Sequence, residues 1–367
     1  MKGKAPIRVL VVDDSALMRK VLVKMLEQED GIEVVGTAMD GVFALEKVEK
    51  LRPDVVTLDL EMPRMDGVTA LKRIVERFHT PVVLVSAHAA KGAAITFEAL
   101  AAGGIDFVAK PERILSAPLE PLGAELVRKI RVAARVSVQK LHHQLVSPAL
   151  VPRALRPFLQ QQKGGHVLAI GVSTGGPNAL SYLLPQIRVD FPAGVLIVQH
   201  MPEGFTTLFA KRLAALCEIE VREAGDGDAI VSGRVLIAPG GRHLKVRRIG
   251  EDQVVELSRS APVRGLRPSV DVMFHSVAEV FGPKATALIM TGMGDDGAEG
   301  MASIKAAGGR TLAQDQGSSV VYGMPKAAVE SGAVDQVLSL YEIGPYLNAL
   351  DMEEGETHEE RREAAGG

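Results

Sequence analysis

A serine directly after a predicted buried strand is the first residue in this chain that could do chemistry. Ser173 lies in GVSTGGPNAL, where an apolar run gives way to helical spacing. Such turns either bind phosphate at a helix N-terminus or expose a nucleophile. The stretch lacks the Lys-Ser/Thr ending of a P-loop, and Ser173 occupies the middle glycine position of G-x-G-x-x-G, which disfavours a nucleotide site. The G-x-S-x-G pattern predicts a nucleophile, with an N-cap role for Ser173 and Thr174 as the alternative.

A serine nucleophile requires a base and an acid, and two further predicted strand ends supply them. His200 closes the apolar stretch GVLIVQH, and Asp295 and Asp296 follow the strand in IMTGMGDDG. An imidazole can accept the serine proton, and a carboxylate can fix its tautomer. These aspartates could instead form a glycine-flanked turn, and two other histidines could replace His200 as the base, namely His243 and His275.

Five residues of another chemistry follow predicted strands in the first third of the chain. Asp13 and Asp14 end the first strand, Asp59 the third, Ser86 the fourth and Lys110 the fifth. Three carboxylates brought together repel one another, and a hard cation such as Mg²⁺ relieves the repulsion. The hydroxyl and the ammonium could bind the oxygens of a phosphoryl group carried by Asp59. Turn formation and helix capping are the alternatives for each residue taken singly.

The elements that must position these residues are predicted from hydrophobic periodicity. The first third alternates five short apolar runs with helical patterns, which predicts a parallel sheet with helices on both faces. A second α/β pattern begins near residue 166 and continues to about 350, with an expected antiparallel hairpin between RVLIAP and VVELS. The Pro- and Gln-rich stretch 135–165 is predicted to be a linker, and the charged residues 351–367 a disordered tail.

Composition restricts the class of protein. The chain has 367 residues, 47% of them hydrophobic, which suffices for a core in each of two domains. A net charge of -3 gives no broad basic field, so we expect no nucleic-acid partner. The single cysteine, Cys217, excludes an intramolecular disulfide. The N-terminal apolar run is too short for a signal peptide or a membrane span, so we expect a cytoplasmic protein that does not insert into membranes.

The first domain resembles the receiver domain of two-component response regulators over residues 6–128. The resemblance rests on VVDDSALMR, TLDLEMPRMDG, VVLVSAH and DFVAKP. It implies a flavodoxin-like fold in which Asp59 is the phosphoacceptor and Mg²⁺ is held by Asp13, Asp14, Asp59 and the Glu61 backbone. Ser86 and Lys110 then sense the phosphoryl group. A chemotaxis histidine kinase is the implied phosphodonor.

The second domain, residues 166–350, resembles the catalytic domain of the chemotaxis protein-glutamate methylesterase family, CheB. The matching segments include GVSTGGP, VQHMP, APGGRH, RPSVDVMFHS, TGMGDDGAEGM and GMPKAA, in the family's order. The resemblance implies Ser173 as the nucleophile, His200 as the base and Asp296 as the acid. It also implies the Met293 N–H as the oxyanion donor, with Thr174 lining the site, and no cofactor for the esterase.

The implied activity is hydrolysis of glutamate γ-methyl esters on the cytoplasmic helices of chemoreceptors, with release of methanol. Glutamine deamidation is an associated activity in some members of the family. Phosphorylation of Asp59 is expected to regulate the hydrolysis. A response regulator whose output domain only binds a partner is the competing hypothesis, because the triad residues could also be capping residues.

Overall fold

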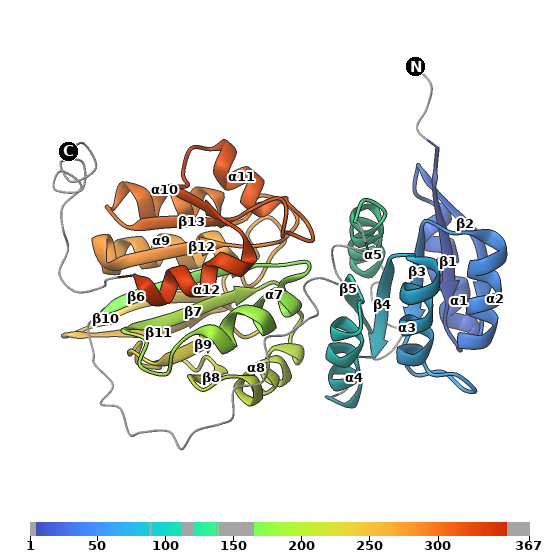
Figure 1. The fold of residues 1–367 in the computed structure, drawn as a ribbon, viewed down its shortest axis with the longest axis horizontal. Helices are drawn as coiled ribbons and strands as arrows, with labels where there is room; N and C mark the ends of the chain where they lie inside the picture. The colour runs from blue at the N-terminus through green and yellow to red at the C-terminus, as the bar shows by residue number, and fades with distance from the viewer. Residues whose placement is uncertain (1–4, 88–89, 112–119, 137, 139–164, 351–367) are drawn as a thin grey trace. The chain divides into compact units, whose positions relative to one another are not determined.

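The computed structural model describes residues 5–87, 90–111, 120–136, 138 and 165–350 (Figure 1). The chain divides into two units, Met1–Val146 and Ser147–Gly367. Most of the predicted linker and the whole predicted tail lie outside the described residues. Within the described residues, no helix combines the length and the apolar character needed to cross a membrane.

The first unit is a five-stranded parallel sheet that alternates with helices along the chain. The strand order is β2-β1-β3-β4-β5, and each neighbouring pair is parallel, as predicted. The strands are β1 (Ile7–Val12), β2 (Ile32–Ala38), β3 (Val55–Asp59), β4 (Val82–Ala87) and β5 (Asp106–Lys110). The helices are α1 (Ala16–Glu27), α2 (Gly41–Leu51), α3 (Gly67–Phe78), α4 (Ala90–Ala101) and α5 (Glu120–Ala133).

Short polar residues begin the helices that follow the first three strands. Ser15, Asp40 and Asp66 accept hydrogen bonds from main-chain N–H groups of the first turns of α1, α2 and α3. Helix α3 starts so close to β3 that a Cβ at Gly67 would lie 2.2 Å from the Asp59 carbonyl oxygen. Glycine is therefore required at this position, and the close approach fixes the main chain at Asp59.

The second unit contains a seven-stranded sheet in which every pairing is parallel. The strand order is β14-β13-β12-β6-β7-β9-β8. These strands are β6 (His166–Val172), β7 (Ala193–Gln199), β8 (Glu220–Glu223), β9 (Arg234–Ile237), β12 (Ala285–Ile289), β13 (Arg310–Gln314) and β14 (Gln336–Leu338). The helices are α7 (Gly176–Leu183), α8 (Phe205–Leu216), α9 (Val270–Phe281), α10 (Ala298–Ala306), α11 (Met324–Glu330) and α12 (Leu340–Ala349), with short 3₁₀ turns η1 (Leu184–Gln186) and η2 (Gly282–Lys284).

The predicted antiparallel hairpin is present, but it begins later than the sequence pattern suggested. Strand β9, which contains RVLI, joins the large sheet in parallel beside β7. The hairpin is formed by β10 (His243–Ile249) and β11 (Asp252–Ser258). An apolar run of four residues carries no signal for the direction of its partner strand, so this difference could not be read from periodicity.

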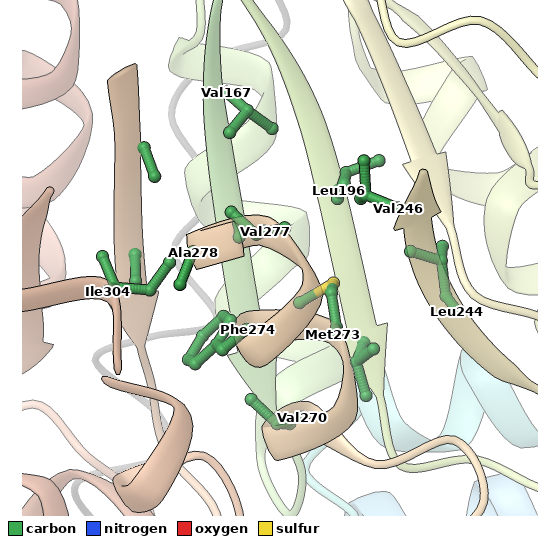
Figure 2. Packing of buried hydrophobic residues seen from close by; sticks show 14 of the residues in the cluster. Val167, Leu196, Leu244, Val246, Val270, Met273, Phe274, Val277, Ala278 and Ile304 are labelled. Carbon is green, nitrogen blue, oxygen red and sulfur yellow. The ribbon is translucent and has the colours of Figure 1, made fainter. Parts of the chain in front are cut away.

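Helix α9 lies at the centre of the hydrophobic core of the second unit. Figure 2 shows Phe274 on the side of the helix that faces Ile304 and Met273 on the side that faces β10. Both side chains are fully buried. Burial of a side chain of this size contributes roughly 1.5–3 kcal/mol. The core therefore fixes α9, and the N-terminus of α9 lies at the candidate active site described next.

Strand β6 occupies the position at which the chain changes direction across the sheet. Its neighbours are β7, the next strand along the chain, and β12, a much later one. The C-terminal ends of strands at such a switch point form a crevice in open parallel sheets. Ser173, His200 and Asp296 follow β6, β7 and β12 in the chain.

Candidate active site and candidate phosphoacceptor site

Ser173 is the first residue after β6, in the turn that leads into α7. Its N–H donates to the Thr291 carbonyl at 3.0 Å, and its side chain is almost completely buried. Gly175 begins the helix with φ of +79°, and a Cβ there would lie 2.7 Å from the Val320 Cβ. Only glycine adopts this turn without strain. Among the described residues, none is hydrogen-bonded to the Ser173 hydroxyl, and this includes the His200 imidazole.

His200 follows β7 and is oriented by a carboxylate. Its main-chain N–H donates to the Val172 carbonyl at 3.1 Å, and its Nε2 lies 2.7 Å from Asp296 Oδ2. An ionised carboxylate only accepts hydrogen bonds, so Nε2 carries the proton and donates it. Nδ1 is consequently the basic nitrogen of the neutral ring. A proton from Ser173 would have to be taken by Nδ1.

Asp296 is held by three further donors besides His200. Its Oδ1 accepts from the Ser269 hydroxyl at 2.8 Å and from the Asp271 N–H at 3.1 Å, and its Oδ2 accepts from the Val270 N–H at 2.7 Å. The carboxylate thus lies against the first turn of α9, where the helix dipole favours a negative charge. Burial opposes ionisation, but the His200 hydrogen bond and the main-chain donors lower the pKa of Asp296 below its usual value. Asp296 therefore remains charged beside the imidazole.

The geometry distinguishes between the alternatives that the sequence left open. His243 accepts from the Ser269 N–H through Nδ1 at 3.2 Å, and its Nε2 lies 3.2 Å from the Ala261 carbonyl oxygen, so neither nitrogen is free to act as a base. Burial also lowers the pKa of His243. His275 is paired with Ser303 at 2.8 Å. Asp295 is exposed and forms an ion pair with Arg264 at 3.2 Å.

The predicted oxyanion donor lies in the loop after β12. Gly292 lies directly against Ser173: a Cβ at Gly292 would lie 2.9 Å from the Ser173 Cβ. The Gly292 N–H donates to the Val321 carbonyl at 3.0 Å, whereas the next N–H, that of Met293, has no acceptor within the described part of the chain. A main-chain N–H without an acceptor can donate to a negatively charged oxygen and stabilise it. Thr174 is buried, and its carbonyl accepts from the Thr291 hydroxyl at 2.9 Å.

Two residues that support the site were not singled out from the sequence. Ser269 caps α9 and donates to Asp296, and Gln199 donates to main-chain carbonyls of the site. The signal for Ser269 was present, since a serine immediately before an apolar helical pattern is typical of an N-cap. The signal for Gln199 was only its place as the polar last residue of an otherwise apolar strand.

The first unit brings together the charged residues that the sequence placed at strand ends. Lys110 Nζ lies 2.8 Å from Asp13 Oδ2 and 2.8 Å from Asp59 Oδ2. Oxygen atoms of Asp13, Asp14 and Asp59 lie within 4.8 Å of one another. Three carboxylates and one ammonium leave an excess of negative charge, and hard oxygen donors of this kind suit Mg²⁺. The donor set fits the predicted cation.

Burial and neighbouring charges shift the pKa values of Asp59 and Lys110 in this cluster. Burial raises the pKa of Asp59 to about 6, although the charge and hydrogen bond of Lys110 act in the opposite direction. Burial alone would lower the pKa of Lys110, but the Asp59 and Asp13 carboxylates raise it above its usual value. Lys110 is therefore a permanent cation that faces the phosphoacceptor candidate.

Two other predicted members of this site, Ser86 and the Glu61 main chain, are held by hydrogen bonds and not by ion pairs. The Ser86 hydroxyl is buried and donates to the Gly92 carbonyl at 3.3 Å while it accepts from the Thr96 hydroxyl at 2.6 Å. It is thus hydrogen-bonded to α4. The Glu61 N–H donates to Asp59 Oδ1 at 3.4 Å, which places the Glu61 backbone beside the cluster.

Comparison with known proteins gives the same two-part division. The family described as CheB methylesterase matches residues 168–347, and the response regulator receiver domain matches residues 9–117. A protein-glutamate methylesterase/protein-glutamine glutaminase 2 of Koribacter versatilis (strain Ellin345) is 55% identical over 339 residues, which cover 91% of this chain and 93% of the relative. A protein-glutamate methylesterase/protein-glutamine glutaminase of Pyrococcus horikoshii is 44% identical and covers 92% of this chain and 91% of the relative.

A solved structure matches the second unit. The crystal structure of the CheB methylesterase catalytic domain of Thermotoga maritima is 41% identical, with a TM-score of 0.50. The match covers 51% of this chain and 99% of that one.

Proposed function

The chain belongs to the CheB methylesterase family, and on this basis we propose that it hydrolyses glutamate γ-methyl esters on the cytoplasmic helices of chemoreceptors and releases methanol. The curated relatives that it matches along nine tenths of its length carry the name protein-glutamate methylesterase/protein-glutamine glutaminase. The observation that carries the proposal is the 2.7 Å hydrogen bond between His200 and Asp296, next to the strand end that bears Ser173.

The proposed reaction proceeds through an acyl-enzyme. Ser173 Oγ attacks the ester carbonyl carbon while His200 Nδ1 accepts the hydroxyl proton, and Asp296 stabilises the imidazolium. The Met293 N–H donates to the oxyanion, a contact typically worth about 3–4 kcal/mol. His200 then returns the proton to the leaving methoxide, which departs as methanol. Water, deprotonated by the same histidine, cleaves the acyl-enzyme and restores the glutamate and the free serine.

The same acyl-enzyme also accounts for glutamine deamidation. A side-chain amide differs from the methyl ester only in its leaving group, which His200 would protonate to ammonia rather than methanol. The relatives' names include the glutaminase activity. We therefore propose both activities for the one triad.

We infer that the receiver unit regulates the esterase through phosphorylation of Asp59, with a chemotaxis histidine kinase as the phosphodonor. Asp13, Asp14, Asp59 and the Glu61 backbone would hold Mg²⁺, which would offset the negative charge of the carboxylates and of the phosphoryl group. Lys110 already pairs with Asp59 and is positioned to bind a phosphoryl oxygen. Ser86 would have to leave its partners on α4 to do the same.

The competing proposal is an output domain that only binds a partner. A capping role alone would not explain why Asp296 combines three donors from Ser269 and the first turn of α9 with the His200 imidazole. A carboxylate that orients an imidazole next to a serine is the arrangement that acyl transfer requires. We therefore favour the enzyme.

The test is methanol release from membranes that contain methylated chemoreceptors. Wild-type protein and Ser173→Ala are compared, each with and without a small phosphodonor and Mg²⁺. Release that requires Ser173 and increases with the phosphodonor supports both the esterase and its regulation. Absence of release from the wild-type protein under both conditions would contradict the esterase proposal and favour a binding output.

A further inference from the structure

The main-chain pairing between β6 and β7 stops just before the two residues that carry the chemistry. Val172 and Gln199 are the last paired residues, and the His200 N–H donates to the Val172 carbonyl at 3.1 Å. The next N–H on β6, that of Ser173, turns to the other side and donates to the Thr291 carbonyl beyond β12. Among the described residues, one sheet hydrogen bond therefore ties His200 to the peptide unit before Ser173, and no main-chain hydrogen bond joins Ser173 and His200 directly.

The side chain of Gln199 connects these two residues instead. Its Nε2 donates to the Ser173 carbonyl at 3.0 Å and to the His200 carbonyl at 3.1 Å. The side chain is buried, with only 2% of the residue exposed. One amide group thus holds the main chain of the serine and of the histidine on adjacent strand ends.

The surroundings of this amide indicate that an apolar residue at position 199 would stabilise the fold more than glutamine does. The Gln199 Oε1 is buried and has no hydrogen-bond partner among the residues that the structure describes. An unsatisfied buried oxygen costs about 1–3 kcal/mol. The absence of a side chain at Gly176 also leaves room for this oxygen, because a Cβ there would lie 2.1 Å from Gln199 Oε1 and 2.6 Å from Val172 Cγ2. The donor end of the amide must compensate for these restrictions.

We propose that Gln199 is a positioning residue that sets the separation between the Ser173 hydroxyl and the His200 imidazole; this inference rests on the esterase proposed above. Its two hydrogen bonds act on the main chain of both residues and on no substrate group. Loss of these bonds leaves the His200 N–H to Val172 bond as the remaining link described between the two strand ends, so the residues beyond it can shift relative to each other. A displacement of about 1 Å between reacting groups costs on the order of 100-fold in rate, and substrate binding is not affected directly.

The chain offers a matched control on β13, near the end of the strand that lies away from the site. Thr311 is fully buried. Its hydroxyl donates to Asp335 Oδ2 at 2.8 Å and accepts from the Asp335 N–H at 3.0 Å. It therefore connects two segments in the same way without a hydrogen bond to Ser173, His200 or Thr291.

The experiment compares Gln199→Met and Thr311→Val in the full chain. Methionine approximates the shape of glutamine and lacks its donors and acceptor. The measurements are kcat and KM for methanol release, the thermal unfolding temperature, and the rate at which a fluorophosphonate labels Ser173. We expect Gln199→Met to lower kcat and the labelling rate by about 10- to 100-fold with KM within about twofold. Thr311→Val should lose stability while it keeps kcat within about threefold.

Two results would overturn the inference. One is a Gln199→Met protein whose kcat and labelling rate stay within threefold of wild type. The other is an equal loss of kcat in both variants, which would indicate general loosening of the fold. The labelling rate also separates this inference from the proposed function: if the wild-type protein labels at Ser173 but releases no methanol, the substrate is wrong, and the comparison of labelling rates still decides the role of Gln199.

Discussion

The His200 imidazole presents its Nε2, and not its Nδ1, to the Asp296 carboxylate, at 2.7 Å. In trypsin-like hydrolases the ring is turned the other way, with Nδ1 toward the acid and Nε2 toward the serine. The reversed ring places the basic nitrogen nearer to the main chain of His200. A short separation of the strand ends of β6 and β7 is therefore required for proton transfer, which is why the spacing of these two ends matters.

Removal of the charge on Asp296 should nearly abolish hydrolysis. In Asp296→Asn the amide no longer stabilises an imidazolium at His200, and kcat should fall by about 10³- to 10⁴-fold. The variant should also unfold at a lower temperature, because α9 loses an ionised cap. The matched control is Asp295→Asn, which removes only an exposed ion pair with Arg264 and should retain kcat within about twofold. Equal losses in the two variants would show that the acid was assigned wrongly.

Replacement of the nucleophile should leave the fold intact and remove the activity. Ser173→Ala should lower methanol release by at least about 10³-fold, with an unfolding temperature close to that of wild type, because its hydroxyl makes no hydrogen bond within the described residues. Ser181→Ala is the control on α7, the helix that follows Ser173, where the hydroxyl donates to the Pro177 carbonyl at 2.7 Å. Wild-type hydrolysis by Ser173→Ala would exclude the serine mechanism.

Regulation should depend on the Asp59 carboxylate. Asp59→Asn cannot form the acyl phosphate, so a small phosphodonor with Mg²⁺ should no longer increase methanol release, while basal release stays unchanged. Asp54→Asn tests the specificity of this effect, because Asp54 lies just before β3, whose last residue is Asp59, and its carboxylate accepts from the Arg8 N–H. If Asp59→Asn is stimulated as strongly as wild type, another group receives the phosphoryl group or the stimulation has another cause.

The raised pKa of Asp59 predicts a pH-dependent stability of the metal-free protein. With a native pKa of about 6 against an ordinary value of 3.8, the folded state retains a proton that the unfolded state releases. Asp59 therefore contributes less stability as pH rises from about 4 to about 6, and the loss is constant above that range. Asp59→Asn should consequently become more stable relative to wild type, by about 2–3 kcal/mol between pH 4 and pH 7. Urea unfolding at pH 5 and pH 7.5 measures the difference, and a difference independent of pH would contradict the buried, protonated carboxyl.

Strand ends were the part of the structure that the sequence predicted best. Parallel sheets bring the carboxyl ends of their strands to one edge, so a polar residue after each apolar run can be assigned to a site from the sequence alone. This reasoning located Asp13, Asp59 and Lys110, and the structure joins them by ion pairs. The same reasoning located His200 and the two candidate acids.

Side-chain direction and long-range pairing could not be predicted in this way. Periodicity does not specify which imidazole nitrogen of His200 faces the acid, and it does not show that the Ser86 hydroxyl pairs with Thr96 on α4. It also does not show that Gln199 connects two strand ends, because a single buried amide leaves no pattern in the sequence. These features depend on contacts between segments that lie far apart in the chain.

The position of β6 between β7 and β12 has a consequence for synthesis of the protein. Val167 on β6 pairs with Ala285 on β12, so one edge of the central strand stays empty until most of the chain has left the ribosome. Ser173 and His200 are made early, whereas Asp296, which both orients the imidazole and caps α9, is among the last parts of the site to appear. An incomplete chain thus contains a nucleophile and a base without the acid, and esterase activity arises only when the second unit is almost fully translated.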